Sequence, residues 1–153
     1  MRGTADPSLL RAPDVTVSRE GLDAEKTVWS AAFTPDGKLV VTGSGDGTAK
    51  IWATASGRLL HTLRHPGPTD YPSEVYSAVF SPDGKLVVTA SDSGTARIWA
   101  SARGRPLHLL GHRETVWSAV FSPDGKQVVT ASEDGTAKIW DTASGSLLHT
   151  LRQ

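Results

Sequence analysis

One segment of about 36 residues occurs three times in this chain, and this repeat constrains the fold more than any single residue does. The stretches 28–63 and 116–151 align without a gap and differ only at residues 32, 34, 39, 43, 45, 53 and 58 of the first copy. A middle copy begins at Val75, so matching positions lie 47 and then 41 residues apart. Segments of this size cannot bury their own apolar faces, and a period of about 40 residues predicts units that stack on one another.

Within each copy the sequence predicts four short strands. In the third copy they are 116–121, 126–132, 136–140 and 147–151, separated by Ser-Pro-Asp-Gly, Asp-Gly and Ser-Gly turn signals. Proline and glycine at those positions favour tight reversals of the chain, and the segments between them are rich in β-branched residues. We therefore predict an all-β fold class, with three four-stranded antiparallel sheets at 28–64, 75–110 and 116–153 after an irregular N-terminal lead-in at 1–27.

Several motifs recur in the same order in each copy. They are Phe-(Ser/Thr)-Pro-Asp-Gly at 33–37, 80–84 and 121–125, a segment ending in Gly-Thr-Ala-(Lys/Arg)-Ile-Trp at 46–52, 93–99 and 134–140, and the pair Gly111-His112. On these motifs, residues 28–153 resemble the WD40-repeat family. The resemblance implies a partial β-propeller of three blades, each blade being one four-stranded sheet.

The resemblance also implies a hydrogen-bonded brace within each blade, formed by a His, a Ser or Thr, an Asp and the third-strand Trp. In the third blade the matching residues are His112, Ser132, Asp134 and Trp140. The first three of these superficially resemble a hydrolytic triad, but in this family they are structural. The other two blades match incompletely, since Ala24 and Tyr71 stand at or near the His positions and Ser93 stands at an Asp position.

A partner-binding face follows from the same resemblance. In WD40 proteins the aromatic residue that opens the first strand, the residue two before it and the residue before the turn Asp often contact partners. The matching positions in this chain are Thr27, Trp29, Gly45, Glu74, Tyr76, Asp92, Thr115, Trp117 and Glu133. Aromatic residues favour binding hot spots, and the acidic residues favour a basic peptide. The alternative is that these aromatic rings pack between blades, because Trp117, Ala119 and Phe121 share one strand face.

Amino-acid composition limits the classes of partner and the cellular location that we expect for this chain. Sixteen basic side chains balance sixteen acidic ones, so the chain lacks the basic surface typical of nucleic-acid binding. No apolar run reaches the length of a membrane span, and cysteine is absent, which is compatible with the cytoplasm. We expect no cofactor and no metal site. The glycine-rich segment 43–47 lacks the following helix of a phosphate loop, and His61, His108 and His149 fall on separate blades.

The sequence therefore predicts a non-catalytic protein–protein interaction scaffold with a protein or peptide partner. The alternative is a propeller that binds a phosphorylated or small ligand, or an accessory domain of a multidomain enzyme, with Arg97, Arg103, Arg105 and Arg113 as candidate anion contacts. Closed propellers have four to eight blades. We therefore expect either two chains that complete a ring as a homo-oligomer or a fragment of a longer chain. The proline-rich connection 64–74 is either a binding loop or a neutral insertion.

Overall fold

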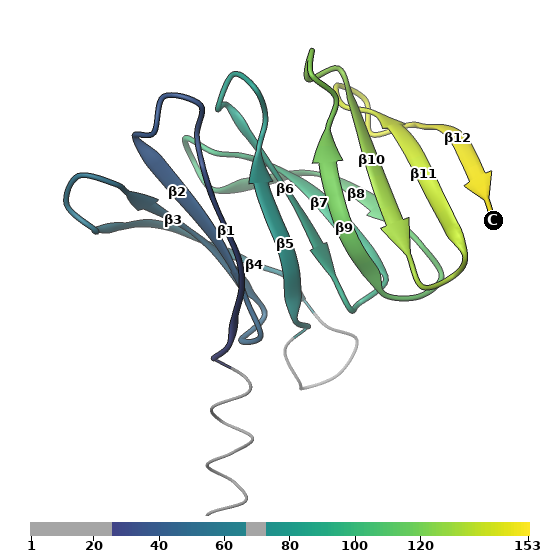
Figure 1. The fold of residues 1–153 in the computed structure, drawn as a ribbon, viewed down its shortest axis with the longest axis horizontal. Coiled ribbons are helices and arrows are strands. Elements are labelled where there is room, and N and C mark those ends of the chain that lie inside the picture. Colours follow the sequence, from purple (N-terminus) through teal and green to yellow (C-terminus); the bar gives the residue numbers. More distant parts are fainter. Residues whose placement is uncertain (1–25, 67–72) are drawn as a thin grey trace, which may run out of the picture.

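The computed structural model describes residues 26–66 and 73–153, which form three four-stranded antiparallel sheets standing side by side (Figure 1). Sheet 1 contains β1 (Val28–Phe33), β2 (Leu39–Ser44), β3 (Thr48–Ala53) and β4 (Leu59–Arg64). Sheet 2 contains β5 (Val75–Phe80), β6 (Leu86–Ser91), β7 (Thr95–Ala100) and β8 (Arg105–Gly111). Sheet 3 contains β9 (Val116–Phe121), β10 (Gln127–Ser132), β11 (Thr136–Asp141) and β12 (Leu147–Arg152).

Each sheet is a meander in which every strand pairs with the next one along the chain. All regular elements within the described residues are strands, so the predicted all-β fold class is confirmed. The Ser-Pro-Asp-Gly turn shows how the sequence sets the first hairpin. Ser122 donates its hydroxyl to Asp124 Oδ1 at 2.7 Å, and that same oxygen accepts the Lys126 amide at 2.9 Å. A carboxylate that bonds its own backbone in this way favours a turn over a continued strand.

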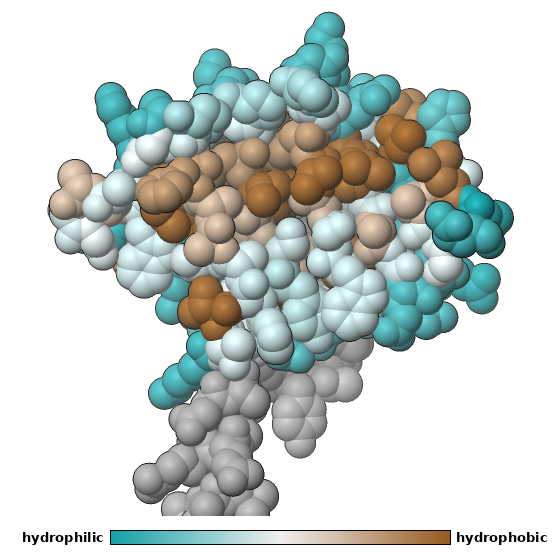
Figure 2. All heavy atoms as spheres, in the orientation of Figure 1, coloured by the Kyte–Doolittle hydropathy of each residue, from teal (hydrophilic) through white to brown (hydrophobic). Residues whose placement is uncertain are grey.

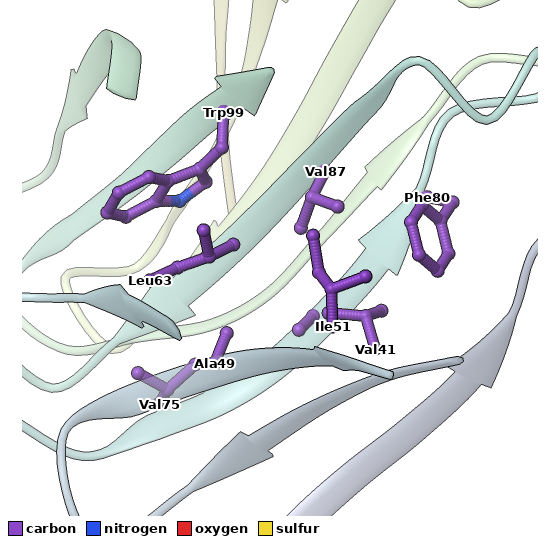
Figure 3. Close-up of a cluster of buried hydrophobic side chains, with 9 residues drawn as sticks. Val41, Ala49, Ile51, Leu63, Val75, Phe80, Val87 and Trp99 are labelled. Carbon is purple, nitrogen blue, oxygen red and sulfur yellow. The ribbon is translucent and has the colours of Figure 1, made fainter. Parts of the chain in front are cut away.

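Two apolar cores lie between the sheets. Between sheets 1 and 2, Val41, Ile51 and Leu63 pack against residues of sheet 2 that include Val75 and Trp99 (Figure 3). Between sheets 2 and 3, the same repeat positions meet again, with Val88, Ile98 and Leu110 facing residues of sheet 3 that include Val116 and Trp140. We call the face of a sheet that points toward the next sheet along the chain its forward face, and the opposite face its backward face. The forward face of one sheet covers the backward face of the next.

The outer faces of the stack carry the same residue types without a covering sheet. On the backward face of sheet 1, Val28 is 61% exposed and Phe33 is 64% exposed, whereas the matching Val75 in sheet 2 is fully buried. On the forward face of sheet 3, Val129 is 37% exposed and Leu151 is 50% exposed. Figure 2 shows apolar residues in a band that crosses the molecule from sheet 1 to sheet 3. The exposures of Val28, Phe33, Val129 and Leu151 make the two outer faces apolar sheet faces open to solvent.

Candidate functional site

Three aromatic side chains at the heads of the first strands form one row, which we call the stack, in which Tyr76 meets Trp29 edge-on and Trp117 at a tilt of 33°. The ring centroid of Tyr76 lies 5.6 Å from that of Trp29 and 5.0 Å from that of Trp117. The stack forms because β1, β5 and β9 run alongside one another (Figure 1). Trp29 is 50% exposed and Trp117 is 48% exposed, so about half of each residue remains accessible although each ring contacts Tyr76 of the neighbouring sheet.

Glu74 connects this stack to an acidic surround. Its carboxylate accepts hydrogen bonds from Nε1 of Trp29 at 3.2 Å and from the hydroxyl of Tyr76 at 3.1 Å. Burial, the hydrogen bond to Glu74 and the charges of Glu74, Asp92 and Glu133 raise the pKa of Tyr76 to about 12. Burial and the charge of Glu74 also raise the pKa of Asp92. Three carboxylates therefore act on one aromatic ring. We call the surface formed by these side chains the aromatic face; its residues are Trp29, Tyr76, Trp117, Glu74, Asp92 and Glu133.

Backbone hydrogen bonds hold the other predicted residues beside the aromatic face. In each sheet, the amide of the residue before the second turn donates to the carbonyl of the residue that precedes the first strand. The three pairs are Gly45 to Thr27 at 2.8 Å, Asp92 to Glu74 at 3.1 Å and Glu133 to Thr115 at 2.9 Å. All nine residues therefore lie at the same end of the sheets. Gly45 is buried, whereas the side chains of Asp92 and Glu133 are exposed.

The brace of sheet 3 contains three of the four predicted side chains. His112 bonds through Nδ1 to Asp134 Oδ2 at 3.0 Å and through Nε2 to Thr130 Oγ1 at 2.6 Å. Nε1 of Trp140 donates to the same Thr130 hydroxyl oxygen at 2.9 Å. Although burial works to raise it, hydrogen bonds from Thr136, the Arg113 amide and His112 hold the pKa of Asp134 well below its usual range.

The prediction that Ser132 belongs to this chain of hydrogen bonds was wrong. Its hydroxyl donates to the Glu114 carbonyl at 3.1 Å and accepts the Asp134 amide at 3.1 Å, so it shapes the turn instead. Thr130 and Ser132 lie two residues apart on β10, and residues at that spacing share one face of a strand. The motif spacing therefore did not distinguish the two hydroxyls.

Sheet 2 has a brace that the sequence analysis missed. His65 is buried, its Nε2 pairs with Thr89 Oγ1, and Nε1 of Trp99 donates to the same oxygen at 2.9 Å. The signal for His65 lies in the preceding strand, because Leu63-Arg64-His65 matches Leu110-Gly111-His112 in position. The insertion at 64–74 hid it, since counting back from β5 leads to Tyr71, which lies outside the described residues.

Sheet 1 shares only part of this arrangement among its described residues. Nε1 of Trp52 donates to Thr42 Oγ1 at 3.0 Å, and Asp46 Oδ1 accepts the amide and the hydroxyl of Thr48 at 2.9 and 2.6 Å. Ala24, which the sequence analysis placed at the His position, lies outside the described residues. The three third-strand tryptophans thus each bond to a threonine hydroxyl on the neighbouring strand.

The family-model comparison decides the identity of this fold. Residues 18–53, 57–100 and 104–141 match the model described as WD domain, G-beta repeat. The chain belongs to the WD40 family. Each matched stretch ends at the third strand of a sheet, and the second and third stretches include the last strand of the preceding sheet. The WD40 sequence repeat is therefore offset by one strand from the structural blade.

Solved WD40 structures share this architecture. The structures titled "Crystal structure of RRP9 WD40 repeats" and "Structure of U3-55K" each match with a TM-score of 0.76 and 27% identity over 84% of this chain. The match covers 39% of the first and 40% of the second of those chains. Both similarities support a WD40 propeller architecture, and the match covers less than half of each neighbour.

A curated relative is a probable serine/threonine-protein kinase, PkwA, from Thermomonospora curvata. It is 42% identical to this chain over 69 residues, which are 44% of this chain and 8% of the kinase. The chain therefore spans less than a tenth of that relative. In residues 26–66 and 73–153 there is no group of three or more potential metal ligands and no helix suited to crossing a bilayer.

The four arginines that we considered as contacts for a phosphorylated ligand do not all lie at one place in the structure. Arg97 lies in the middle of β7, Arg103 and Arg105 lie at the β7–β8 turn, and Arg113 follows the far end of β8. A phosphorylated ligand bound by all four is therefore inconsistent with the structure. Arg97 lies instead in a pocket with Arg64 and His65.

Proposed function

We propose that this chain is a non-catalytic protein-interaction module whose aromatic face binds a basic segment of a partner protein. The observation that supports this proposal is the half-exposed stack of Trp29, Tyr76 and Trp117 beside three carboxylates. The absence of cysteine suits a reducing compartment, and we propose a cytoplasmic location.

A lysine or arginine side chain fits this surface on two grounds. A cation over the face of a tryptophan or tyrosine ring gains about 0.5–2 kcal/mol, depending on how far it is desolvated. The carboxylates of Glu74, Asp92 and Glu133 add attraction that weakens as salt is added. An acidic segment would meet the same carboxylates as like charges, so the face discriminates by charge.

Peptide binding followed by tryptophan fluorescence tests this function. A blocked Lys- and Arg-containing peptide should bind more tightly than the same peptide with Glu at those positions. Glu74→Gln should weaken binding of the basic peptide about fivefold or more, because it removes the negative charge and disturbs the hydrogen bonds to Trp29 and Tyr76. Glu114→Gln, the same change at an exposed carboxylate that bonds to none of the three aromatic rings, should weaken binding less. Equal binding of both peptides, or equal effects of the two variants, would sink the proposal.

The two outer sheet faces supply a second interaction surface. Their residues match those buried between sheets, so the occupant that they fit is another WD40 blade. A second copy of this chain is one source of such a blade, and further blades of a longer polypeptide are the other. Three blades from each of two chains give six, which lies within the range of closed propellers.

Contacts between neighbouring sheets show how a further blade fits. His108 on β8 bonds through Nε2 to the Ala143 carbonyl of sheet 3 at 2.9 Å, beside Gly145. His61 on β4 lies against Gly104 of sheet 2 in the same way. The corresponding pair at the outer faces is His149 of sheet 3 and Gly57 of sheet 1. No atom would lie within 4 Å of a Cβ added at Gly57, so the space that a histidine fills beside Gly104 and Gly145 is open there. Docking of sheet 3 on sheet 1 of a second copy would form this third contact.

Light scattering of the purified chain tests this assembly. A discrete species of two chains supports self-assembly, and Phe33→Glu should reduce it to one chain because it places a charge on the backward face of sheet 1. Leu107→Glu is the matched control, since Leu107 is exposed on β8 away from both outer faces. A single chain that binds hydrophobic dye supports further blades from a longer polypeptide. A stable single chain that binds no dye contradicts both.

An accessory role in a multidomain enzyme is the second candidate function. The similarity to 8% of the probable kinase PkwA favours it, because WD40 blades and a catalytic domain would then share one polypeptide. In that arrangement the blades still act by binding. Fusing the chain to a kinase domain and measuring phosphorylation of a basic-peptide-tagged substrate, with and without Glu74→Gln, tests whether the aromatic face recruits substrates.

A further inference from the structure

Two residues that line one pocket, His65 and Arg97, carry buried donor atoms without a partner among the described residues. Within residues 26–66 and 73–153, Nδ1 of His65 and Nε of Arg97 are buried and make no hydrogen bond. The side chain of His65 is 4% exposed. Both residues line a pocket of about 620 Å³ together with Asp46, Arg64, Trp99 and Pro106. A buried donor without an acceptor is costly, so a group that accepts both hydrogens would be favoured here.

Sheet 3 shows which chemical group fits the histidine donor. The position equivalent to His65 is His112, whose Nδ1 meets the carboxylate of Asp134 at 3.0 Å. In sheet 2 the residue equivalent to Asp134 is Ser93, whose hydroxyl is paired with Thr95 Oγ1 at 2.7 Å. The rest of the two braces is the same, because each histidine Nε2 and each indole nitrogen share one threonine oxygen. Sheet 2 therefore has the frame of the brace without its carboxylate.

The second donor is also specific to sheet 2. Arg97 pairs with Thr89 in the register of β6 and β7, as Lys138 pairs with Thr130 in sheet 3. Nζ of Lys138 donates to the Gly111 carbonyl at 3.1 Å, whereas Nε of Arg97 has no acceptor in the described part of the chain. Burial lowers the pKa of Arg97, so its charge is poorly hydrated, but the group stays cationic at neutral pH.

The protonation state of His65 fixes its role as a donor. Burial and then the charge of Arg97 lower its pKa to about 3, so the ring is neutral at pH 7 and one nitrogen carries the hydrogen. The Thr89 oxygen accepts the indole hydrogen of Trp99 and can give its own hydrogen to Nε2 of His65. The ring hydrogen then lies on Nδ1, as it does in sheet 3, where Nδ1 of His112 bonds to the Asp134 carboxylate.

We propose that this pocket binds a carboxylate, which accepts hydrogen bonds from Nδ1–H of His65 and Nε–H of Arg97, as the Asp134 carboxylate accepts one from His112 in sheet 3. Arg64 adds a second positive charge to the pocket and Asp46 adds one negative charge. This balance suits a singly charged carboxylate better than a multiply charged phosphate. The carboxylate is either that of a free small acid or that of an acidic side chain, since both present the same two oxygens.

Acetate titration of the intact chain, followed by NMR of the His65 ring and the Arg97 Nε–H, tests this site. At pH 7 and constant ionic strength, acetate should shift both signals in a saturable way, and chloride should not. Ser93→Asp should weaken acetate binding about tenfold or more, because the chain then supplies its own carboxylate to the donors. Arg97→Gln should weaken it as well, whereas Arg103→Gln, the same change on the exposed β7–β8 turn, should not.

The outcomes separate the proposal from a pocket that holds only water. If acetate produces no saturable shift at His65, or the same shift in the wild-type chain and in Ser93→Asp, the proposal fails. The Arg97 variant keeps the test decisive if Ser93→Asp does not fold. A blocked tripeptide with a central Glu distinguishes the two sources of the carboxylate. If the tripeptide binds the wild-type chain and binds Arg97→Gln more weakly, the natural ligand is an acidic side chain. If acetate binds and the tripeptide does not, the natural ligand is a free acid.

Discussion

Replacing His112 by Ala tests whether the hydrogen-bonded brace stabilises sheet 3. The side chain of His112 is fully buried and joins two neighbours that have no other link to each other in that brace. It contacts the Thr130 hydroxyl at 2.6 Å and the Asp134 carboxylate at 3.0 Å. An alanine at this position removes both bonds and leaves the carboxylate partly desolvated.

The expected cost follows from those two bonds. A neutral internal hydrogen bond contributes about 1 kcal/mol, and one to a charged group contributes about 1.5–3 kcal/mol. Asp134 keeps the amides of Arg113 at 3.1 Å and Thr136 at 2.9 Å, so only one of its partners is lost and the bond to the charged group counts at the lower end of its range. We therefore expect His112→Ala to lower the free energy of unfolding by about 2–3 kcal/mol. For a domain of this size, that corresponds to a fall of roughly 4–12 °C in the midpoint of thermal unfolding.

Urea unfolding followed by tryptophan fluorescence, at one fixed protein concentration, measures this cost. His149→Ala is the matched control, because His149 is exposed on β12 and the change should cost less than about 0.5 kcal/mol. His65→Ala should fall between the two, since His65 bonds to a threonine but to no carboxylate. If His112→Ala and His149→Ala unfold at the same urea concentration, the brace does not stabilise sheet 3.

Two further predictions concern the pH dependence of stability and the contacts between sheets. The pKa of Asp134 is lowered in the folded chain, so its stabilising effect is present above its unfolded pKa of about 4 and is lost as the pH falls below that value. The difference in urea midpoint between the wild-type chain and Asp134→Asn should therefore be larger at pH 7 than at pH 3, and an equal difference would contradict this. Gly145 and Gly57 have φ values of 72° and 70°, so Ala is strained at either, but only at Gly145 would the new Cβ come within 2.8 Å of His108. Gly145→Ala should lower the thermal midpoint more than Gly57→Ala does, and equal losses would show that the contact with His108 carries no weight.

The fold was predictable because each sheet is specified locally. The third copy predicts strands at 116–121, 126–132, 136–140 and 147–151, and the structure has them at Val116–Phe121, Gln127–Ser132, Thr136–Asp141 and Leu147–Arg152. Turn residues determine where each strand ends, and the same pattern of strands and turns occurs in all three copies of the repeat. Stacking follows from the apolar faces, which no single sheet can bury alone.

The site was less predictable because it depends on which side chains meet across strands. Thr130 and Ser132 have the same chemistry and lie on the same face of β10, so only the register between β10 and β11 selects Thr130, which pairs with Lys138 beside the indole of Trp140. His65 was missed because the position was counted from the following strand, across the insertion. The stacking of Tyr76 between Trp29 and Trp117 likewise requires the spacing of three separate strands, which no local pattern contains.

The difference between sheets 2 and 3 has a physical explanation in their surroundings. Sheet 2 is covered on both faces, with Val75, Val88 and Leu110 fully buried, so packing on both faces helps to hold its strands in place. Sheet 3 has one open face, on which Leu151 is 50% exposed, and it therefore depends more on bonds within the sheet. The complete brace with its carboxylate occurs in this less covered sheet. A sheet that packs on both faces can tolerate Ser93 in place of an aspartate, which leaves Nδ1 of His65 without the carboxylate that His112 has in sheet 3, and in our proposal a bound carboxylate takes that role.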